Sequence, residues 1–348
     1  MQALTVLPGS PDSARLDAFD APCGDPTGLT LESLAVGVCG TDLEILAGQY
    51  GTPPPGRERL VLGHECLARV RERGAGFESG ESVVPIVRRP DPVPCPACAA
   101  GDWDMCRNGR FTEHGIKGLD GFCAQQLRVN PDYLVRVPPA LGLHAVLVEP
   151  ASVVAKAWEH IEHIGRRSRW RPRRVLVTGA GPIGLLAALL GRQRDLEVTV
   201  FDRATGGAKP ALVRELGADY VTGDLAHFLV ESPPDIILEC TAATPVVVEV
   251  MRRNAPGGIC CLVGVSAAGR EVPLDVGALN RSVVLENDVI FGSVNANRRH
   301  YELAVQALSG ADPQWLDRLI SRRVPLARWR EAFVRQPDDV KVLLEIAA

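Results

Sequence analysis

The sequence has 348 residues, of which 46% are hydrophobic and 23% are charged. This composition is typical of globular proteins and excludes an intrinsically disordered chain, and the length suits two domains of ordinary size. Forty-two acidic and 38 basic side chains give a net charge of −4, which excludes a net positive charge over the whole molecule that would attract nucleic acid.

Membrane insertion and export are also not indicated by the sequence. The run Leu185–Leu190 has only six apolar residues, far short of the roughly 20 that a membrane-spanning helix needs. The first eight residues have no basic segment ahead of an apolar stretch. Ten cysteines are sparse for a secreted disulfide scaffold, and several have metal-ligand spacing. We therefore expect a cytoplasmic protein with reduced thiols, without a membrane or nucleic-acid partner.

The first 150 residues are rich in Gly, Pro and Cys, with short apolar runs between turn signals. This texture predicts a β-rich domain with long loops. The expected strands are Leu31–Val38, Leu60–Leu62, Leu67–Val70, Ser82–Val87 and Cys123–Val129.

After Pro150 the pattern changes to a helix, Val153–Ile164, and then to strands and helices in alternation. Such alternation predicts a parallel sheet with helices on both faces. The alternating elements are Val175–Val177, Gly184–Arg194, Val198–Phe201, Lys209–Leu216, Ile236–Leu238, Val246–Arg253 and Ile259–Gly264. Near Asn295 the alternation stops, and the remaining expected elements are helices at His300–Leu308 and Leu316–Ile320 and a strand at Lys341–Glu345.

One charge cluster stands out, with six arginines in the nine residues 166–174. Such a cluster is compatible with a nucleic-acid patch. Because the rest of the chain is acidic, we interpret it instead as a solvated surface loop that leads into the strand at Val175.

A Gly-x-Gly-x-x-Gly pattern joins the strand at Val175 to the helix that follows. Gly179 permits the tight turn, Gly181 lets the backbone approach a pyrophosphate, and Gly184 lets helix and strand pack closely. Pro182 and Ile183 complete the turn, beyond which the helix offers unpaired N–H groups to phosphates. These residues predict a dinucleotide site.

The next strand ends in Asp202, 18 residues after Gly184, where a carboxylate can accept hydrogen bonds from the adenosine ribose. A carboxylate there repels a 2′-phosphate, whereas the neighbouring Arg203 attracts one. The pair favours NAD, with NADP or dual use as the alternative.

Three segments of the first domain carry candidate ligands for a catalytic zinc. Cys39 offers a thiol, His64 an imidazole, and Glu65 and Glu149 carboxylates. These are suitable ligands for a zinc ion that keeps one position open for water or substrate. Spacing alone does not link them, because ligands scattered along a chain have no local signature.

Cys95, Cys98 and Cys106 lie within twelve residues of a loop rich in Gly and Asp, which is typical of a closed structural zinc site. A tetrahedral site needs four ligands. The fourth ligand is Asp91, Asp102 or Asp104, or else the thiols hold no metal.

The order of these motifs resembles the zinc-dependent medium-chain dehydrogenase/reductases over essentially the whole chain. The motifs are Cys-Gly-Thr-Asp, Gly-His-Glu, the cysteine lobe, Glu-Pro and Gly-Ala-Gly-Pro-Ile-Gly. Three further strings resemble the glucose 1-dehydrogenase branch: Arg88–Pro90, Thr112–Gly118 and Gly292–Tyr301. The last string is the most specific, since general alcohol dehydrogenases do not usually carry it.

The resemblance implies an α/β protein made of a β-rich, GroES-like catalytic domain and a Rossmann domain with a doubly wound parallel sheet. The catalytic, zinc-binding domain would comprise residues 1–155 and 296–348, and the dinucleotide-binding domain residues 156–295. The active site would lie between the domains. A homo-oligomer, dimer or tetramer, is expected by the same analogy.

The resemblance also implies roles for particular residues. Cys39, His64, Glu65 and Glu149 match the catalytic zinc positions, and Thr41 matches the hydroxyl beside the reacting alcohol. Glu113, Asn295 and Asn297 match positions that hold sugar hydroxyls or close over the nicotinamide. Hydride would pass from C1 of an aldose such as glucose to the nicotinamide and leave a lactone, with zinc acting as a Lewis acid.

The sequence departs from the family pattern in two ways. Pro92 stands where the structural lobe usually has its first cysteine, and Asp202 argues against a strong NADP preference, although many such glucose dehydrogenases use NADP or both cofactors. Three alternatives remain: a zinc-dependent polyol, cyclitol or secondary-alcohol dehydrogenase; a zinc-free reductase; and a binding protein without catalysis.

Overall fold

The structure is a computed structural model that describes residues 1–267, 269 and 271–347. The chain divides into two compact units. The first combines Met1–Ser152 with Asn295–Ala348, and the second is Val153–Val294. The sequence places the corresponding boundaries at 155/156 and 295/296. We describe each unit by itself.

The first unit is β-rich and is built on one large sheet with the strand order β12-β7-β6-β4-β11-β3. The C-terminal segment adds β20 beside β4, and β19 beside β20. Two smaller sheets have the orders β2-β1-β5 and β10-β9-β8. The strands are β1 (Gln2–Val6), β2 (Arg15–Ala18), β3 (Cys23–Gly24), β4 (Leu29–Gly37), β5 (Leu60–Val61), β6 (Glu65–Val70), β7 (Ser82–Pro85), β8 (Arg88–Arg89), β9 (Thr112–His114), β10 (Gly118–Leu119), β11 (Gln126–Val129), β12 (Leu134–Arg136), β19 (Ile320–Pro325) and β20 (Lys341–Glu345).

Short helices connect these strands, and apolar strand side chains such as Leu31, Val36 and Leu127 form the core between them. The helices are α1 (Gly40–Leu46), α2 (Pro96–Ala99), α9 (Arg298–Ser309), α10 (Pro313–Leu319), α11 (Trp329–Ala332) and the 3₁₀ turns η1 (Trp103–Met105), η2 (Pro131–Tyr133), η3 (Pro139–Leu147) and η4 (Leu326–Arg328). The helix predicted at Leu316–Ile320 is present, but α10 begins earlier, at Pro313, and ends at Leu319, because Ile320 begins strand β19.

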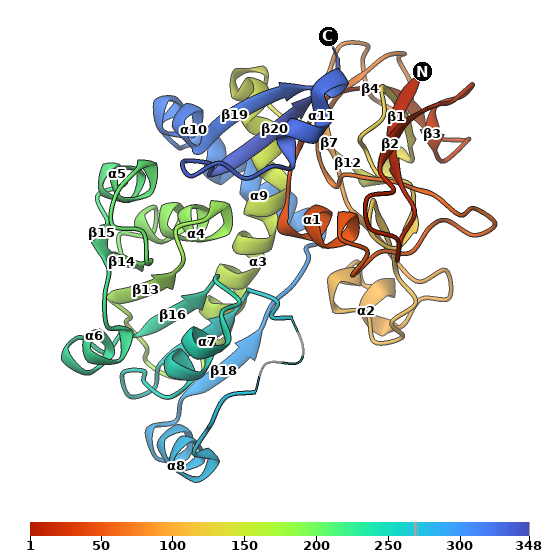
Figure 1. Ribbon diagram of the computed structural model, residues 1–348. Coiled ribbons are helices and arrows are strands. Elements are labelled where there is room, and N and C mark those ends of the chain that lie inside the picture. Colours follow the sequence, from red (N-terminus) through yellow and green to blue (C-terminus); the bar gives the residue numbers. More distant parts are fainter. Residues whose placement is uncertain (268, 270, 348) are drawn as a thin grey trace. The chain divides into compact units, whose positions relative to one another are not determined.

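The second unit contains a parallel sheet of six strands in the order β15-β14-β13-β16-β17-β18 (Figure 1). This order reverses at β13, as in dinucleotide-binding folds. The strands are β13 (Arg174–Thr178), β14 (Glu197–Phe201), β15 (Asp219–Val221), β16 (Ile236–Glu239), β17 (Ile259–Leu262) and β18 (Val289–Gly292). The helices are α4 (Pro182–Arg192), α5 (Ala208–Glu215), α6 (Leu225–Glu231), α7 (Thr244–Met251) and α8 (Val276–Glu286), and α3 (Val148–Gly165) begins in the first unit and ends in the second.

The alternation of strands and helices predicted from the sequence is confirmed, and so is the mixed α/β fold class. Helix α8 escaped sequence analysis because none of its side chains is buried, so it lacks the apolar stripe that marks a packed helix. All six arginines of residues 166–174 are exposed, as expected for a surface loop.

The segment 139–165 is the one stretch of the described chain that is long and apolar enough to cross a membrane by length and composition. Its most apolar window is 67% buried inside the protein, as core helices are. Counting uninterrupted apolar runs overlooked it because Glu149, Ser152 and Lys156 interrupt the apolar residues.

Candidate functional site

Cys39 is positioned by the turn that ends strand β4 and begins helix α1. Its backbone is extended and forms the N-terminal cap of the helix. Asp42, three residues into the helix, accepts a hydrogen bond from the Cys39 N–H through Oδ2 at 2.9 Å. This contact fixes the angle at which the chain enters the helix. The other oxygen of Asp42 lies 3.4 Å from Nδ1 of His64, so one buried carboxylate orients both residues.

The sheet brings the other donors to the same place. Strand β6 begins at Glu65 and pairs antiparallel with β4, in a register that sets Glu65 opposite Gly37. A side chain at Gly37 would begin 2.0 Å from Oε2 of Glu65, so only glycine leaves room for this carboxylate. Lys341, the first residue of β20, forms a buried ion pair with Glu65 and donates to the Val38 carbonyl at 3.1 Å.

Cys39, His64 and Glu65 each present a ligand atom, and these atoms all lie within 4.8 Å of one another. Thiol, imidazole and carboxylate suit zinc, which takes ligands at about 2.0–2.3 Å in a tetrahedron. Because Asp42 faces Nδ1 of His64, Nε2 is left for the metal, and carboxylate contacts of this kind commonly orient zinc-bound histidine. The donor set therefore fits a zinc ion.

The charges around these donors also favour a cation. Burial alone would lower the pKa of His64, but the nearby Asp42 and Cys39 outweigh this effect and raise the pKa well above its usual range. Burial raises the pKa of Glu149 to about 7, and the charge of Glu65 adds to this shift. Several anionic groups thus share a buried region in which Lys341 supplies a compensating charge.

The structure separates the predicted zinc residues into two groups. Glu149, at the start of α3, is buried and senses the charges of His64 and Glu65, but it lies outside the group of atoms within 4.8 Å. The Thr41 hydroxyl lies beside the cluster, with Oγ1 4.0 Å from the Cys39 sulfur.

Glu113 and Asn295, the predicted sugar contacts, are joined directly, since Nδ2 of Asn295 donates to Oε1 of Glu113 at 2.7 Å. The same oxygen accepts from Arg88, whose Nε and Nη2 lie at 3.1 and 3.0 Å. Asn297 lies elsewhere. Its amide donates to Oδ1 of Asp102 and of Asp104 at 3.2 and 2.9 Å, so its side chain fastens the cysteine lobe.

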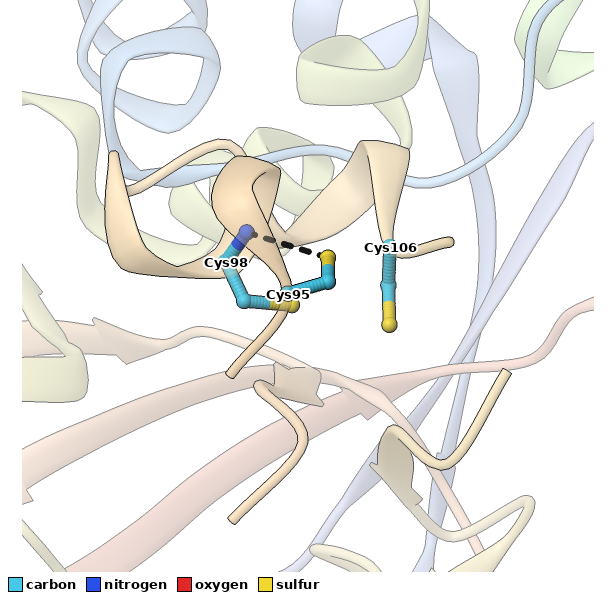
Figure 2. Close-up of side chains that lie close together, drawn as sticks. All are labelled: Cys95, Cys98 and Cys106. Atoms are coloured by element: carbon cyan, nitrogen blue, oxygen red, sulfur yellow. Dashed lines mark hydrogen bonds between the residues drawn. The ribbon is translucent and has the colours of Figure 1, made fainter. Parts of the chain in front are cut away.

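The three cysteines of the lobe converge, with ligand atoms within 4.8 Å of one another. Figure 2 shows the three thiols: Cys95 caps the N-terminus of the short helix α2, Cys98 lies within that helix, and Cys106 directly follows η1. The backbone N–H groups of Arg107 and Cys98 donate to the Cys95 sulfur at 3.4 and 3.5 Å and lower the pKa of this thiol to about 6. Thiolate is the form that binds metal, so the lobe is also suited to zinc.

The aspartates considered as fourth ligands are engaged in other contacts. Asp91 accepts hydrogen bonds from Val93, Asn108 and Arg110. Asp102 and Asp104 both accept from Asn297. Within the described chain, none of the three joins the cluster of thiols.

The Gly-rich turn lies between β13 and α4, as its sequence predicts. Gly179 has φ of +89°, in the left-handed region that glycine tolerates best. A Cβ at Gly184 would begin 1.8 Å from the Gly179 carbonyl oxygen, whereas one at Gly181 would meet nothing within 4 Å. Gly181 therefore borders open space where a pyrophosphate can approach, and α4 begins at Pro182, followed by Ile183, with its N-terminus at this turn.

Asp202 follows β14 and accepts hydrogen bonds from Ala180 and Ala204 at 2.7 and 2.9 Å. These N–H groups hold the pKa of the carboxyl below its usual range against the opposing effect of burial. Lys209 lies 3.5 Å from the same carboxylate, and Arg203 is exposed. The carboxylate therefore also ties the Gly-rich turn to the next strand.

Sequence reasoning assigned no role to Asp42 or Lys341 and did not separate Arg88 from the string that carries it. Asp42 had a usable signal, because an acidic residue three positions after a helix cap predicts a capping contact. Lys341 had none, since it lies 276 residues from Glu65 in the chain.

Comparison with known proteins agrees with this arrangement. Residues 25–139 match the alcohol dehydrogenase GroES-like domain, and residues 142–346 match the glucose dehydrogenase C-terminus. Glucose 1-dehydrogenase 1 of Caldivirga maquilingensis is 41% identical over 99% of both chains, and the Methanocella arvoryzae glucose 1-dehydrogenase is 37% identical over 100% of both. A Haloferax mediterranei glucose dehydrogenase, solved with NADP, Zn and gluconolactone, is 29% identical over 100% of both chains, with a TM-score of 0.93.

A GroES-like domain combined with a Rossmann sheet defines a medium-chain dehydrogenase/reductase. Within that class, the chain belongs to the zinc-dependent glucose dehydrogenase family. The resemblance inferred from the sequence motifs is thereby confirmed.

Proposed function

We propose that this protein is a zinc-dependent NAD(P) dehydrogenase that oxidises C1 of an aldose such as glucose to a lactone. The observation that carries the proposal is the convergence of Cys39, His64 and Glu65 within 4.8 Å in a chain 41% identical to a glucose 1-dehydrogenase. The zinc-free alternative is disfavoured, because a reductase without metal has no need for these donors.

The first unit would bind zinc and sugar. Cys39, His64 and Glu65 would hold the ion, and the buried Glu149, which interacts electrostatically with His64 and Glu65, would be a further ligand in exchange with Glu65 or water. Zinc, when bound, supplies a Lewis acid that lowers the pKa of the C1 hydroxyl. Thr41 accepts the hydroxyl proton and passes it outward. Glu113 accepts a hydrogen bond from another sugar hydroxyl, because Oε1 is held by Arg88 and Asn295 and Oε2 is left for the ligand.

The second unit would bind the cofactor. The turn Gly179–Gly184 receives the pyrophosphate at the start of α4, and Asp202 accepts from the ribose. One hydride, carrying two electrons, leaves C1 for C4 of the nicotinamide, and the hydroxyl proton goes to solvent. Asp202 favours NAD, while Arg203 and Lys209 offer positive charge to the 2′-phosphate of NADP, which the Haloferax relative binds.

A reduction assay with NAD and NADP tests the proposal. The panel comprises glucose, its C2 and C4 epimers, polyols and secondary alcohols, each with and without a chelator. We expect aldoses to give reduced cofactor and lactone, and the chelator to abolish the reaction. Reduction with polyols or alcohols alone would place the protein in the polyol or alcohol branch, and cofactor binding without any turnover would make it a binding protein.

We further propose a cytoplasmic homo-oligomer. Val265, Val276, Val284 and Leu285 are each more than 60% exposed, and α8, which carries the last three, buries none of its side chains. Strand β18 forms one edge of the sheet. Exposed apolar side chains and a free sheet edge support self-association at this end of the second unit. The ten free thiols, seven of them in the two clusters or buried in the first unit's core, suit a reducing compartment.

A further inference from the structure

The first unit contains a cavity of about 730 Å³ that the proposed reaction does not use. Three arginines line it, Arg57, Arg89 and Arg128, together with Asp25 and Asp120. Cavities of roughly 300–1,000 Å³ are typical of small-molecule sites. The charges of the lining residues identify what this cavity can hold.

Arg89 is largely buried and has no carboxylate within ion-pair distance among the described residues, and the charge of Asp25 acts on it only at longer range. Its Nη1 donates to the carbonyls of Ile86 and Arg88 at 2.6 and 3.3 Å, and its guanidinium lies 4.0 Å from the centre of the Tyr133 ring. Burial lowers the pKa of this group to about 10, which still leaves it protonated at neutral pH. Its Nε and Nη2 have no protein acceptor in the described chain and remain available.

Arg128 adds a second cation, for which the described part of the chain offers no carboxylate within ion-pair distance. Its Nη1 donates to the Pro26 carbonyl at 2.8 Å, and its Nε is buried without an acceptor in the described chain. Arg57, in contrast, forms an ion pair with Asp120. His114 on the same wall stays neutral, because burial and the charge of Arg89 lower its pKa to about 3. The three arginines and two aspartates leave the lining with an excess of positive charge.

This cavity is separate from the predicted sugar contacts. Successive side chains of a strand point to opposite faces. In β8, Arg88 therefore contacts Glu113 while Arg89 lines the cavity, and in β9 Glu113 faces Arg88 while His114 lines the cavity. The two small strands thus form a wall between the Glu113–Asn295 pair and the arginines.

We propose that this cavity binds a small oxyanionic metabolite, with its phosphate or carboxylate group at Nε and Nη2 of Arg89 and with Arg128 beside it. Burying a guanidinium without an ion-paired carboxylate is costly, and a bidentate oxyanion reduces that cost. The planar guanidinium of Arg89 is already held by the Tyr133 ring and two carbonyls, so little conformational freedom is lost when an anion binds.

Calorimetric titration at constant ionic strength tests this site. Inorganic phosphate and succinate are titrated separately into the zinc-loaded protein saturated with NADH and glucose, a pair that cannot react, so that the cofactor and sugar sites stay filled. We expect at least one anion to bind, and the tighter of the two to distinguish a phosphorylated from a carboxylated ligand. Arg89→Met and Arg128→Met should each weaken binding about tenfold or more, because each removes charge-assisted hydrogen bonds. Arg89→Lys, which keeps the charge without the fork, should fall between wild type and Arg89→Met.

Arg136→Met is the matched control. Arg136 also stacks on an aromatic ring, 3.9 Å from the centre of Phe77, but it is paired with Glu81. The Arg136→Met variant should bind the anions with a dissociation constant within about twofold of the wild-type value. The proposal is overturned if neither anion binds the wild-type protein, or if Arg89→Met and Arg128→Met bind as wild type does. Because Arg128→Met and Arg89→Lys are independent variants, misfolding of Arg89→Met alone leaves the test intact.

Discussion

Arg88 and Glu113 form a buried ion pair in which two nitrogens of the guanidinium donate to a single carboxylate oxygen, at 3.1 and 3.0 Å. The two side chains are only 6% and 8% exposed. The remaining Nη1 donates to the Asp104 carbonyl at 3.2 Å, and the Phe111 ring lies 3.6 Å from the guanidinium. Arg88 thus links the cysteine lobe to the carboxylate that we propose contacts the sugar.

Replacing Arg88 should cost both stability and sugar affinity. Arg88→Met leaves Glu113 buried with only the Asn295 amide as a partner, which costs about 3–5 kcal/mol for a pair of this kind. We expect a lower melting temperature and a raised KM for the aldose with a smaller change in kcat. Adding Glu113→Gln should restore much of the stability but not the KM. A variant as stable as wild type would show that the pair contributes little.

Mutations in the two clusters of zinc ligands should have different effects on zinc content and turnover. We expect two zinc ions per chain, measured by atomic emission. Cys39→Ala and His64→Ala should each lose one zinc and lower turnover about a thousandfold or more, since a Lewis acid contributes several kcal/mol, while cofactor binding persists.

Cys98→Ala should lose the other zinc, melt at a lower temperature and keep measurable turnover. Cys261→Ala, a buried thiol of β17 outside both clusters, is the control and should keep both ions. One zinc per wild-type chain would mean that the cysteine lobe is empty, and unchanged turnover in Cys39→Ala would remove zinc from the reaction.

Alanine substitutions at two glycines of the dinucleotide turn should affect different properties, stability at Gly184 and cofactor affinity at Gly181. Gly184→Ala places a methyl group 1.8 Å from the Gly179 carbonyl oxygen, so the backbone must move and the melting temperature should drop by several degrees. Gly181→Ala meets no protein atom within 4 Å and has φ of −83°, so its melting temperature should stay unchanged. Its methyl group instead occupies the approach to the pyrophosphate, and cofactor affinity should fall about tenfold or more. If Gly181→Ala bound the cofactor with wild-type affinity, the pyrophosphate would have to bind at another place.

Acid should weaken the first unit through Asp339. Arg322 donates to both oxygens of Asp339, at 3.1 and 2.7 Å, and these bonds hold the pKa of the carboxyl below its ordinary value of 3.8. A lowered pKa stabilises the fold above 3.8, and this contribution disappears as the pH falls through the lowered value. We expect Asp339→Asn to lose about 1 kcal/mol at pH 7 and almost nothing at a pH below the lowered pKa, measured by urea unfolding. Equal losses at both pH values would contradict this assignment.

Local motifs were predictable from the sequence because their function depends on neighbouring residues. The Gly-rich turn needs glycine at fixed spacing between a strand and a helix, and Cys95, Cys98 and Cys106 lie close enough in the chain to converge without distant contacts. The alternation of strands and helices likewise follows from local periodicity. The residue types of the zinc donors could be listed, but their meeting could not be derived from spacing.

The contacts that the sequence did not predict depend on the pairing of β4 with β6 and β20. It places Cys39 beside Glu65 and brings Lys341 from near the C-terminus to neutralise that carboxylate. It also leaves Glu149 outside the tight cluster, and the lobe's aspartates take the amide of Asn297. A sequence by itself determines which groups are present and how the adjacent backbone turns. Only strand register and packing determine which distant side chains meet, because those contacts depend on the whole sheet closing at once.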